Sequence, residues 1–414
     1  MMRVASETEP MGAQIDIRPV TEATYEAFRH AFAATFGFAS STDEIERSRA
    51  WAEYDRLLAA RAPDGSIVGT SGALSFGLSL PGARSAACAG ITMVSVRADH
   101  RRRGLLTRMM VDLLDDAAAR SEPFAALWAS ESPIYGRYGF GPAVPTIDIS
   151  LDRRHADLHL DGPVGEVRFI DIEEARTTFP ALHERFRTTR GGVMSRSDGW
   201  WTRVLTEQPS PAKATGPLRL ALLPDRGYVI YHLASAWSDG APRGVVHVHD
   251  LVGLDPAALA ALWRFAIDTD LSETLEIVRR PPDDPVLHLL RDPARARVGA
   301  GWPLYLRLVD VPSALASRGY LVDGTVVVEV ADRLRPANAG RWRLTVSDGT
   351  GRCDRTDEAP DVSLDVAELA AISLGGVRAT ALLDAGRIDG SSAAALGLDR
   401  LFAAERAPVC DQMF

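Results

Sequence analysis

The sequence predicts a multidomain α/β protein whose last part is richer in β structure. The chain has 414 residues, of which 46% are hydrophobic and 24% charged, values typical of an ordinary globular protein. Residues 90–130 read as a strand, an amphipathic helix and a second strand, which is the basic unit of α/β folds. Residues 244–270 repeat the order of a strand and an amphipathic helix. These observations predict three domains, at residues 1–152, 153–300 and 301–414.

The first domain begins with a strand, a helix and a strand pair at residues 65–81, followed by a strand at 90–97. The helix that follows has one apolar face, because its apolar residues recur at helical spacing. That face comprises Leu105, Leu106, Met109, Met110, Leu113, Leu114 and Ala117. A strand at 123–130 and a turn at 134–141, IYGRYGFG, complete the unit.

The second and third domains are predicted from the same kinds of sequence pattern. The second has helices at 173–189 and 256–270 with several strands between them. It resembles a weak internal repeat of the first domain, with GLDPAA where the first domain has an arginine–glycine turn. The third domain is β-rich and ends with short helices around 363–374 and 391–405.

Composition excludes several classes of function. The net charge is −9, which argues against nucleic acid or an anionic membrane as the main partner. Three widely spaced cysteines suggest neither a disulfide framework nor a zinc site. His247 and His249 have no third ligand nearby in the sequence, so we expect no metal. The N-terminal residues lack an apolar signal-peptide core and no apolar run is long enough for a membrane span, so we expect a cytoplasmic protein.

Positive charge is concentrated at residues 101–107, RRRGLLT, where the strand at 90–97 leads into the apolar-faced helix. A helix N-terminus has unpaired backbone N–H groups and a positive dipole end, both of which suit phosphate oxygens. A glycine allows close approach of the backbone, and arginines add charge-assisted hydrogen bonds. The segment therefore predicts a pyrophosphate site. A solvated basic loop is the alternative.

The order of strand, R-x-x-G-x, amphipathic helix, strand and Tyr-x-x-x-Gly-Phe resembles the GCN5-related N-acetyltransferases. Within them, VSVRADHRRRGLL (94–106) and ASESPIYGRYGFGPA (129–143) resemble the motifs of the enhanced intracellular survival (Eis) family of aminoglycoside and lysine N-acetyltransferases. The resemblance covers most of the chain. It implies tandem acetyltransferase domains, the second degenerate, followed by a sterol-carrier-like α+β domain. It also implies acetyl-CoA as co-substrate and a homohexamer.

The resemblance assigns roles residue by residue. Val94, Ser95 and Val96 would bind the pantetheine arm of acetyl-CoA through backbone groups, one N–H polarising the thioester carbonyl. Ser130 and Glu131 would lie on the other side of the cofactor. The residues implied for the pyrophosphate are Arg102, Arg103, Gly104, Leu105, Leu106 and Thr107.

Two further residues are implied for proton transfer. Attack of an amine on a thioester needs a neutral amine, a stabilised oxyanion and a proton for the departing sulfur. Tyr135 would be the general acid, although a structural role is the alternative for a buried tyrosine and Tyr138 is close in sequence. Phe414 would supply its terminal carboxylate as the base, with a loose tail as the alternative.

The sequence also departs from the family pattern. Well-known members carry an acidic residue just before the terminal Phe and another early in the first domain, whereas Met413 and the segment TFGF with Phe36 stand there in this chain. We expect Phe36 and Met413 at the substrate pocket, with Asp411 or Glu44 as possible replacements for the acids. Fewer carboxylates attract a polycation less strongly, so strong aminoglycoside activity is less expected than acetyl transfer itself. The alternative function is a non-catalytic protein that binds an apolar ligand and has a vestigial CoA site.

Overall fold

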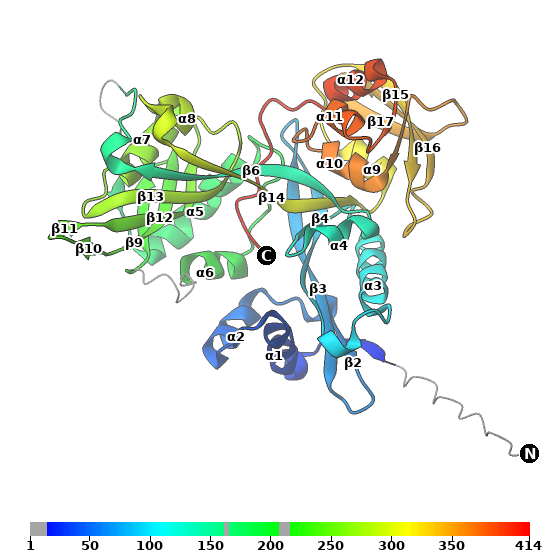
Figure 1. The fold of residues 1–414 in the computed structure, drawn as a ribbon, viewed down its shortest axis with the longest axis horizontal. Coiled ribbons are helices and arrows are strands. Elements are labelled where there is room, and N and C mark those ends of the chain that lie inside the picture. Colours follow the sequence, from blue (N-terminus) through cyan, green and yellow to red (C-terminus); the bar gives the residue numbers. More distant parts are fainter. Residues whose placement is uncertain (1–14, 161–164, 207–215) are drawn as a thin grey trace, which may run out of the picture. The chain divides into compact units, whose positions relative to one another are not determined.

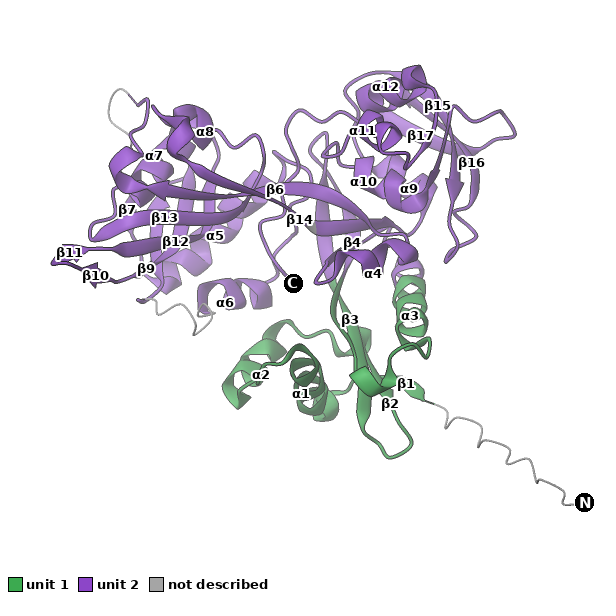
Figure 2. Cartoon of the chain, viewed as in Figure 1, with its two compact units in different colours: residues 1–74, 91–116 green, residues 75–90, 117–414 purple. Residues whose placement is uncertain are grey.

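The computed structural model describes residues 15–160, 165–206 and 216–414. It divides into two compact units, coloured separately in Figure 2. Unit 1 contains residues up to 74 and residues 91–116, and unit 2 contains residues 75–90 and 117–414. Strands β3 (Ile67–Leu80) and β4 (Arg84–Val96) contribute residues to both units. Within the described ranges, no helix is long and apolar enough to cross a membrane.

Unit 1 is a small sheet with helices on both faces (Figure 1). Besides β3 and β4 it contains β1 (Asp16–Pro19), β2 (Leu57–Arg61), α1 (Tyr25–Phe36), α2 (Thr42–Ser48) and most of α3 (Leu105–Ala119). β2 pairs antiparallel with both β1 and β3. Ala59 of β2 packs with Tyr25 of α1, whereas the next residue, Ala60, packs with Leu105 and Met109 of α3. Because successive strand residues point to opposite faces, α1 and α3 cover opposite faces of this sheet.

Helix α3 confirms the helix predicted from apolar spacing. Of the seven apolar residues predicted for its inner face, all are buried except Leu106, which is partly buried. The buried face packs α3 on the sheet directly after the arginine turn.

Unit 2 contains a mixed sheet whose strands follow the order β5-β14-β6-β13-β12-β9-β8-β7. Strand β14 lies between β5 and β6 and pairs antiparallel with both, since Leu304 is opposite Trp128 and Ala300 is opposite Ile147. Strands β12 and β13 are parallel and are joined through α7. The bounds are β5 Phe124–Trp128, β6 Gly141–Asp152, β7 Arg168–Phe169, β8 Arg219–Leu223, β9 Gly227–Ala234, β12 Gly244–Gly253, α7 Pro256–Ile267, β13 Ser272–Arg280 and β14 Arg297–Leu308.

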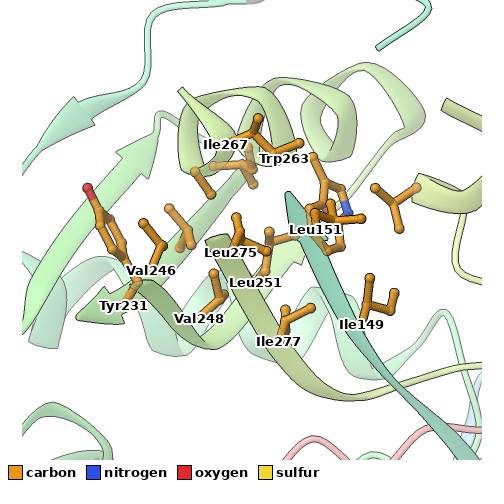
Figure 3. Packing of buried hydrophobic residues seen from close by; sticks show 14 of the residues in the cluster. Ile149, Leu151, Tyr231, Val246, Val248, Leu251, Trp263, Ile267, Leu275 and Ile277 are labelled. Atoms are coloured by element: carbon orange, nitrogen blue, oxygen red, sulfur yellow. The ribbon is translucent and has the colours of Figure 1, made fainter. Parts of the chain in front are cut away.

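Both faces of this sheet are covered. Figure 3 shows the core on one face, where strand residues such as Val246 and Leu275 pack together with Trp263 of α7. On the opposite face, α5 (Ile172–Arg187) and α6 (Asp198–Thr206) pack around Tyr228. The shorter elements are α4 (Ser132–Tyr135), α8 (Val286–Leu289), β10 (Trp237–Ser238) and β11 (Ala241–Pro242).

The C-terminal part of unit 2 is a separate five-stranded sheet, ordered β17-β16-β15-β18-β19, with four helices. Two of these helices, α10 and α12, confirm the helices predicted near the end of the chain. The bounds are α9 Val311–Ser317, β15 Gly324–Ala331, β16 Gly340–Ser347, β17 Thr350–Arg355, β18 Val362–Asp365, α10 Val366–Ile372, α11 Ala379–Asp384, β19 Asp389–Gly390 and α12 Ser392–Leu401. After α12 the chain continues to Phe414 without regular structure for most of its length.

Candidate active site

The arginine turn between β4 and α3 has a backbone that suits an anion. A single 3₁₀ turn, Ala98–His100, follows β4. Arg102 then has φ 63° and Gly104 has φ 75°. The Gly104 carbonyl accepts the Arg108 N–H at 3.0 Å, so α3 starts directly after the glycine. A glycine serves here because its φ lies in the left-handed region, while the space beside it is open.

The charge of the turn is directed outward. Arg103 Nη2 donates to the Asp99 carbonyl at 3.1 Å, and Arg101 Nε donates to the Val96 carbonyl at 3.4 Å, whereas Arg102 is exposed with no hydrogen bond or ion pair to any described residue. Asp99 is the acid nearest in the chain, and hydrogen bonds from Arg97 and then His100 hold its pKa well below its ordinary value. Because Arg97 binds that carboxylate, Asp99 does not neutralise the three arginines of the turn, and their positive charge can attract an anionic ligand.

The end of β4, which the resemblance assigns to the pantetheine arm, has an irregular backbone. Met93 has φ 50°, a conformation that is uncommon for a side chain other than glycine. The Thr70 hydroxyl of β3 donates to the Met93 carbonyl at 2.8 Å, and the Ser95 hydroxyl lies 2.7 Å from the Thr70 hydroxyl oxygen. Since the Thr70 proton is already used, Ser95 donates to Thr70. Ser95 is buried, while Val94 and Val96 are partly buried.

A cleft of about 310 Å³ lies beside this strand end in unit 1. Ser95 and Arg101 line it together with Thr35 and other residues of α1. The predicted strand and the predicted arginine turn therefore border one cavity. Phe36, at the end of α1, lies just beyond these lining residues in the chain and is 47% exposed, in an aromatic cluster with Phe32 and Phe38.

Tyr135 ends the short helix α4 in unit 2. Its side chain is buried and its ring meets that of Phe140 edge-on at 6.4 Å. Burial raises the pKa of Tyr135, an effect that hydrogen bonding by the Ser130 hydroxyl opposes. Ser130 and Glu131 are exposed directly before α4. The structure therefore brings Ser130 to the phenol of Tyr135, a contact that the sequence did not predict.

Two glycines allow neighbouring segments to pack closely against the turn that carries Tyr135. Gly139 has φ 78°, and a Cβ atom there would collide with the Arg307 guanidinium. Arg307 is fully buried and ion-paired with Asp332 at 2.6 Å. At Gly141 a Cβ atom would collide with the Ala367 carbonyl of α10. The Tyr-x-x-x-Gly-Phe-Gly pattern thus permits close approach of β14 and α10 to the turn that presents Tyr135.

The end of the chain is packed rather than frayed. The Phe414 ring lies 5.0 Å from the Phe76 ring, and Phe76 meets Trp200 of α6 edge-on at 5.5 Å. Arg203 Nη1 donates to the Met413 carbonyl at 3.1 Å. The Met413 side chain itself is exposed. Sequence reasoning missed Phe76 and Trp200, which carry no motif and lie far from residue 414 in the chain.

The two carboxylates suggested as replacements for the missing acids are both engaged elsewhere. Glu44 Oε2 accepts the Ser41 N–H at 2.8 Å and closes a capping box at the start of α2. Asp411 is ion-paired with Arg196 and bonded to His183, each at 2.9 Å. Asp411 is therefore already paired with a cation, whereas Glu44 is exposed and its role at the substrate pocket stays a prediction.

The paired histidines of β12 are bound to neighbours in the sheet. His249 Nε2 lies 2.6 Å from Nδ1 of His232 on β9, and His247 lies 3.2 Å from Glu276 on β13. Burial, followed by the charges of the neighbouring histidines, lowers the pKa of His249 to about 4. Neutral His249 therefore shares a single hydrogen bond with His232.

Family models match three segments of the chain. Residues 16–143 and 192–308 each match an acetyltransferase (GNAT) domain, and residues 311–411 match a sterol carrier protein domain. An uncharacterized N-acetyltransferase of Streptomyces coelicolor is 38% identical over 87% of this chain and 89% of its own length.

Relatives of known name and structure agree with these matches. The N-acetyltransferase Eis of Mycobacterium tuberculosis is 35% identical over 84% of this chain and 88% of its own length. The crystal structure of Eis1 from Mycobacterium abscessus superposes with a TM-score of 0.85 at 32% identity, covering 96% of this chain and 100% of that one. The predicted architecture of two acetyltransferase domains and a sterol-carrier-like domain is thereby confirmed. The chain is an N-acetyltransferase and belongs to the Eis family.

Proposed function

We propose that the protein transfers an acetyl group from acetyl-CoA to a primary amine by direct attack of the amine nitrogen on the thioester carbonyl. A C–N bond forms and the C–S bond breaks. The nitrogen loses a proton and the departing sulfur gains one. This chemistry requires an anion site for the diphosphate, a general acid and a general base.

The arginine turn is the anion site of this proposal. Arg102, Arg103 and the backbone from Gly104 to Thr107 bind the diphosphate at the start of α3. The supporting observation is the pair of left-handed residues, Arg102 and Gly104, directly before a fifteen-residue helix whose inner face is buried. Val94, Ser95 and Val96 bind the pantetheine arm, and Ser130 and Glu131 lie on its other side.

Tyr135 is the general acid. Because burial raises its pKa, the phenol keeps its proton at neutral pH and can donate it to the departing thiolate. A positioned general acid contributes about 10²–10⁴-fold to the rate.

The terminal carboxylate of Phe414 is the general base. The ring contact with Phe76 and the bond from Arg203 to the Met413 carbonyl support this role, because a base must be held in place. After transfer, the phenolate of Tyr135 regains a proton and the carboxyl group of Phe414 releases one, both by exchange with solvent.

The amine is a monoamine or a lysine side chain in preference to an aminoglycoside. Met413 and Phe36 offer apolar surface where known family members carry acids, and Asp411 is already paired with Arg196. A polycation therefore gains less Coulomb attraction than in a pocket with unpaired carboxylates.

The decisive experiment measures CoA release with a panel of amines for the wild type, Tyr135→Phe and a chain lacking Phe414. Both variants should lose most of their turnover while binding acetyl-CoA normally. Tyr138→Phe is the matched control, since Tyr138 is buried in the same turn. Full turnover in both variants would show that the acid and the base are wrongly assigned.

The competing function is binding of an apolar ligand without catalysis, through the sterol-carrier-like domain. Calorimetry distinguishes the two. Micromolar binding of acetyl-CoA supports the enzyme, whereas binding of a lipid with no response to acetyl-CoA supports the alternative.

We further expect a cytoplasmic homohexamer, as the family resemblance implies. Light scattering on the purified protein measures the number of chains directly.

A further inference from the structure

One buried arginine connects the end of the chain to the second acetyltransferase domain. Arg196 Nη2 donates to Asp411 Oδ2 at 2.9 Å and Arg196 Nε donates to Gln412 Oε1 at 2.9 Å. Its remaining nitrogen, Nη1, donates to Asp250 Oδ2 of β12 at 2.6 Å. The exposed fractions of the three charged side chains are 2%, 12% and 6% for Arg196, Asp411 and Asp250. The arginine thus holds two successive tail residues against the sheet.

His183 and Tyr228 complete this cluster. His183 Nε2 lies 2.9 Å from Asp411 Oδ2, and the Tyr228 hydroxyl donates to Asp250 Oδ2 at 2.8 Å. Burial, and then the charge of Arg196, lowers the pKa of His183, so the ring is neutral at neutral pH and donates through Nε2–H. Burial acts to raise the pKa of Asp411, but the charge of Arg196 and the contact with His183 outweigh it and lower that pKa. Asp411 is therefore an anion that accepts two hydrogen bonds.

The last two residues are held by separate contacts. Arg203 binds the Met413 carbonyl, and the Phe414 ring packs on Phe76. From Asp411 to the terminal carboxylate is a span of three residues, at most about 10 Å of extended chain. Anchors on residues 411, 412, 413 and 414 therefore confine the terminal carboxylate.

The ion cluster fixes which residue of the tail lies beside Arg196. Burying charges gains little stability, because desolvation offsets much of the Coulomb energy, and apolar residues would pack as well. A shift of the tail by one residue, however, would separate Asp411 from Arg196 and would leave Arg196 with Asp250 as its only carboxylate partner among the described residues, and breaking a buried ion pair in this way is strongly unfavourable. Apolar packing alone would permit such shifts at a smaller penalty.

We propose that Arg196 and Asp411 are positioning residues for the terminal carboxylate of Phe414. This inference rests on the proposed role of that carboxylate as the base. The cluster does not contact the reacting atoms. It acts by fixing the place from which Phe414 accepts the amine proton.

A double-mutant cycle tests the proposal with the full-length protein. Asp411→Asn keeps the shape of the side chain but removes its charge, and kcat should fall by up to about 100-fold, the effect of misplacing a catalytic group by about 1 Å. The KM for acetyl-CoA should stay unchanged. In the chain that lacks Phe414, the terminal carboxylate belongs to Met413 and is displaced by one residue, so the same substitution should lower kcat no further.

A matched control separates positioning from loss of stability. Asp399→Asn removes another largely buried carboxylate, which binds Arg378 and the start of α11 in the sterol-carrier-like domain. Its effect on kcat should be small and the same with and without Phe414. If Asp411→Asn does not fold, Gln412→Met removes one hydrogen bond of Arg196 without removing a charge and should show the same non-additivity.

The outcomes distinguish the positioning role of Asp411 from the role of the Phe414 carboxylate as the base. If loss of Phe414 lowers kcat but Asp411→Asn has no effect, or an equal effect with and without Phe414, the positioning role is overturned and the base remains. If loss of Phe414 leaves kcat unchanged, the assigned base is wrong, and the positioning role falls with it.

Discussion

Phe414 and Phe76 are in ring contact, with 5.0 Å between their centroids and 49° between their planes. Gly90 of β4 lies beside the same pair, since a Cβ atom there would come within 3.1 Å of the Phe414 ring and still closer to Phe76. The final residue of this chain is thus seated in a small aromatic site of unit 2, where Phe76 contacts both Phe414 and Trp200.

Removal of that ring should weaken catalysis without removing the base. Phe414→Ala retains the terminal carboxylate, and an aromatic pair contributes about 0.5–1.5 kcal/mol, so kcat should fall about 2- to 10-fold. Phe414→Tyr keeps the ring and should remain near wild type. Steady-state CoA release measures both, and an alanine variant with wild-type kcat would contradict the seating of the tail by Phe76.

Gly104→Ala should weaken acetyl-CoA binding. An alanine at φ 75° costs about 1–2 kcal/mol of backbone strain, and relief of that strain would rotate the N–H groups of the turn. Gly65→Ala, at φ 84° with similarly open surroundings, is the matched control and should lose stability alone. Calorimetry with acetyl-CoA and thermal unfolding separate the two effects. Equal affinities in both variants would argue against an anion site at Gly104.

Gly139→Ala should destabilise the turn that carries Tyr135 by at least about 2 kcal/mol, because the new methyl group meets the buried Arg307 at a left-handed backbone position. Gly136→Ala lies three residues earlier in open space with φ −57° and should be nearly neutral. Chemical denaturation provides the free energy of unfolding. Similar values for the two variants would show that the Arg307 side chain moves away from the new methyl group at little cost in free energy.

Acid should destabilise the protein through His183 and His249 before it affects carboxylates, because burial lowers the pKa of both histidines. The folded-state pKa of His183 is below the ordinary value of about 6.5, so the unfolded chain binds a proton that the folded chain resists. The free energy of unfolding should therefore decline as the pH falls from 7 to 5. His183→Gln, which can still donate to Asp411, should flatten this slope.

His30→Gln is the matched control for that experiment, since the His30 side chain is 52% exposed. It should keep the wild-type slope. Urea unfolding at several pH values provides the measurement, and an unchanged slope in His183→Gln would remove His183 as the cause.

Local features of the first domain were predictable from the sequence. The apolar face of α3 follows from residues spaced three and four apart, and the arginine turn follows from a glycine and a basic run at the start of that helix. The left-handed backbone of Met93 was not predictable, because nothing in the residue itself favours it. It is held by Thr70, a residue of another strand.

The tail cluster could not be predicted because its contacts are remote in sequence. Arg196 and Asp411 are 215 residues apart, and neither belongs to a motif. The sequence suggested Asp411 as a carboxylate for substrate, whereas the fold buries it beside a cation. Only the resemblance drew attention to Phe414, since composition and periodicity say nothing about a final residue.

The insertion of β14 between β5 and β6 limits how the protein can be divided. A fragment that stops at residue 152 would lack the strand that joins β5 to β6, leaving two apolar edges with unpaired backbone groups. Such edges recruit strands from other molecules, so this fragment should aggregate when produced alone. Supplying residues 153–414 in trans should restore solubility, because the missing strand would then be available to fill the gap.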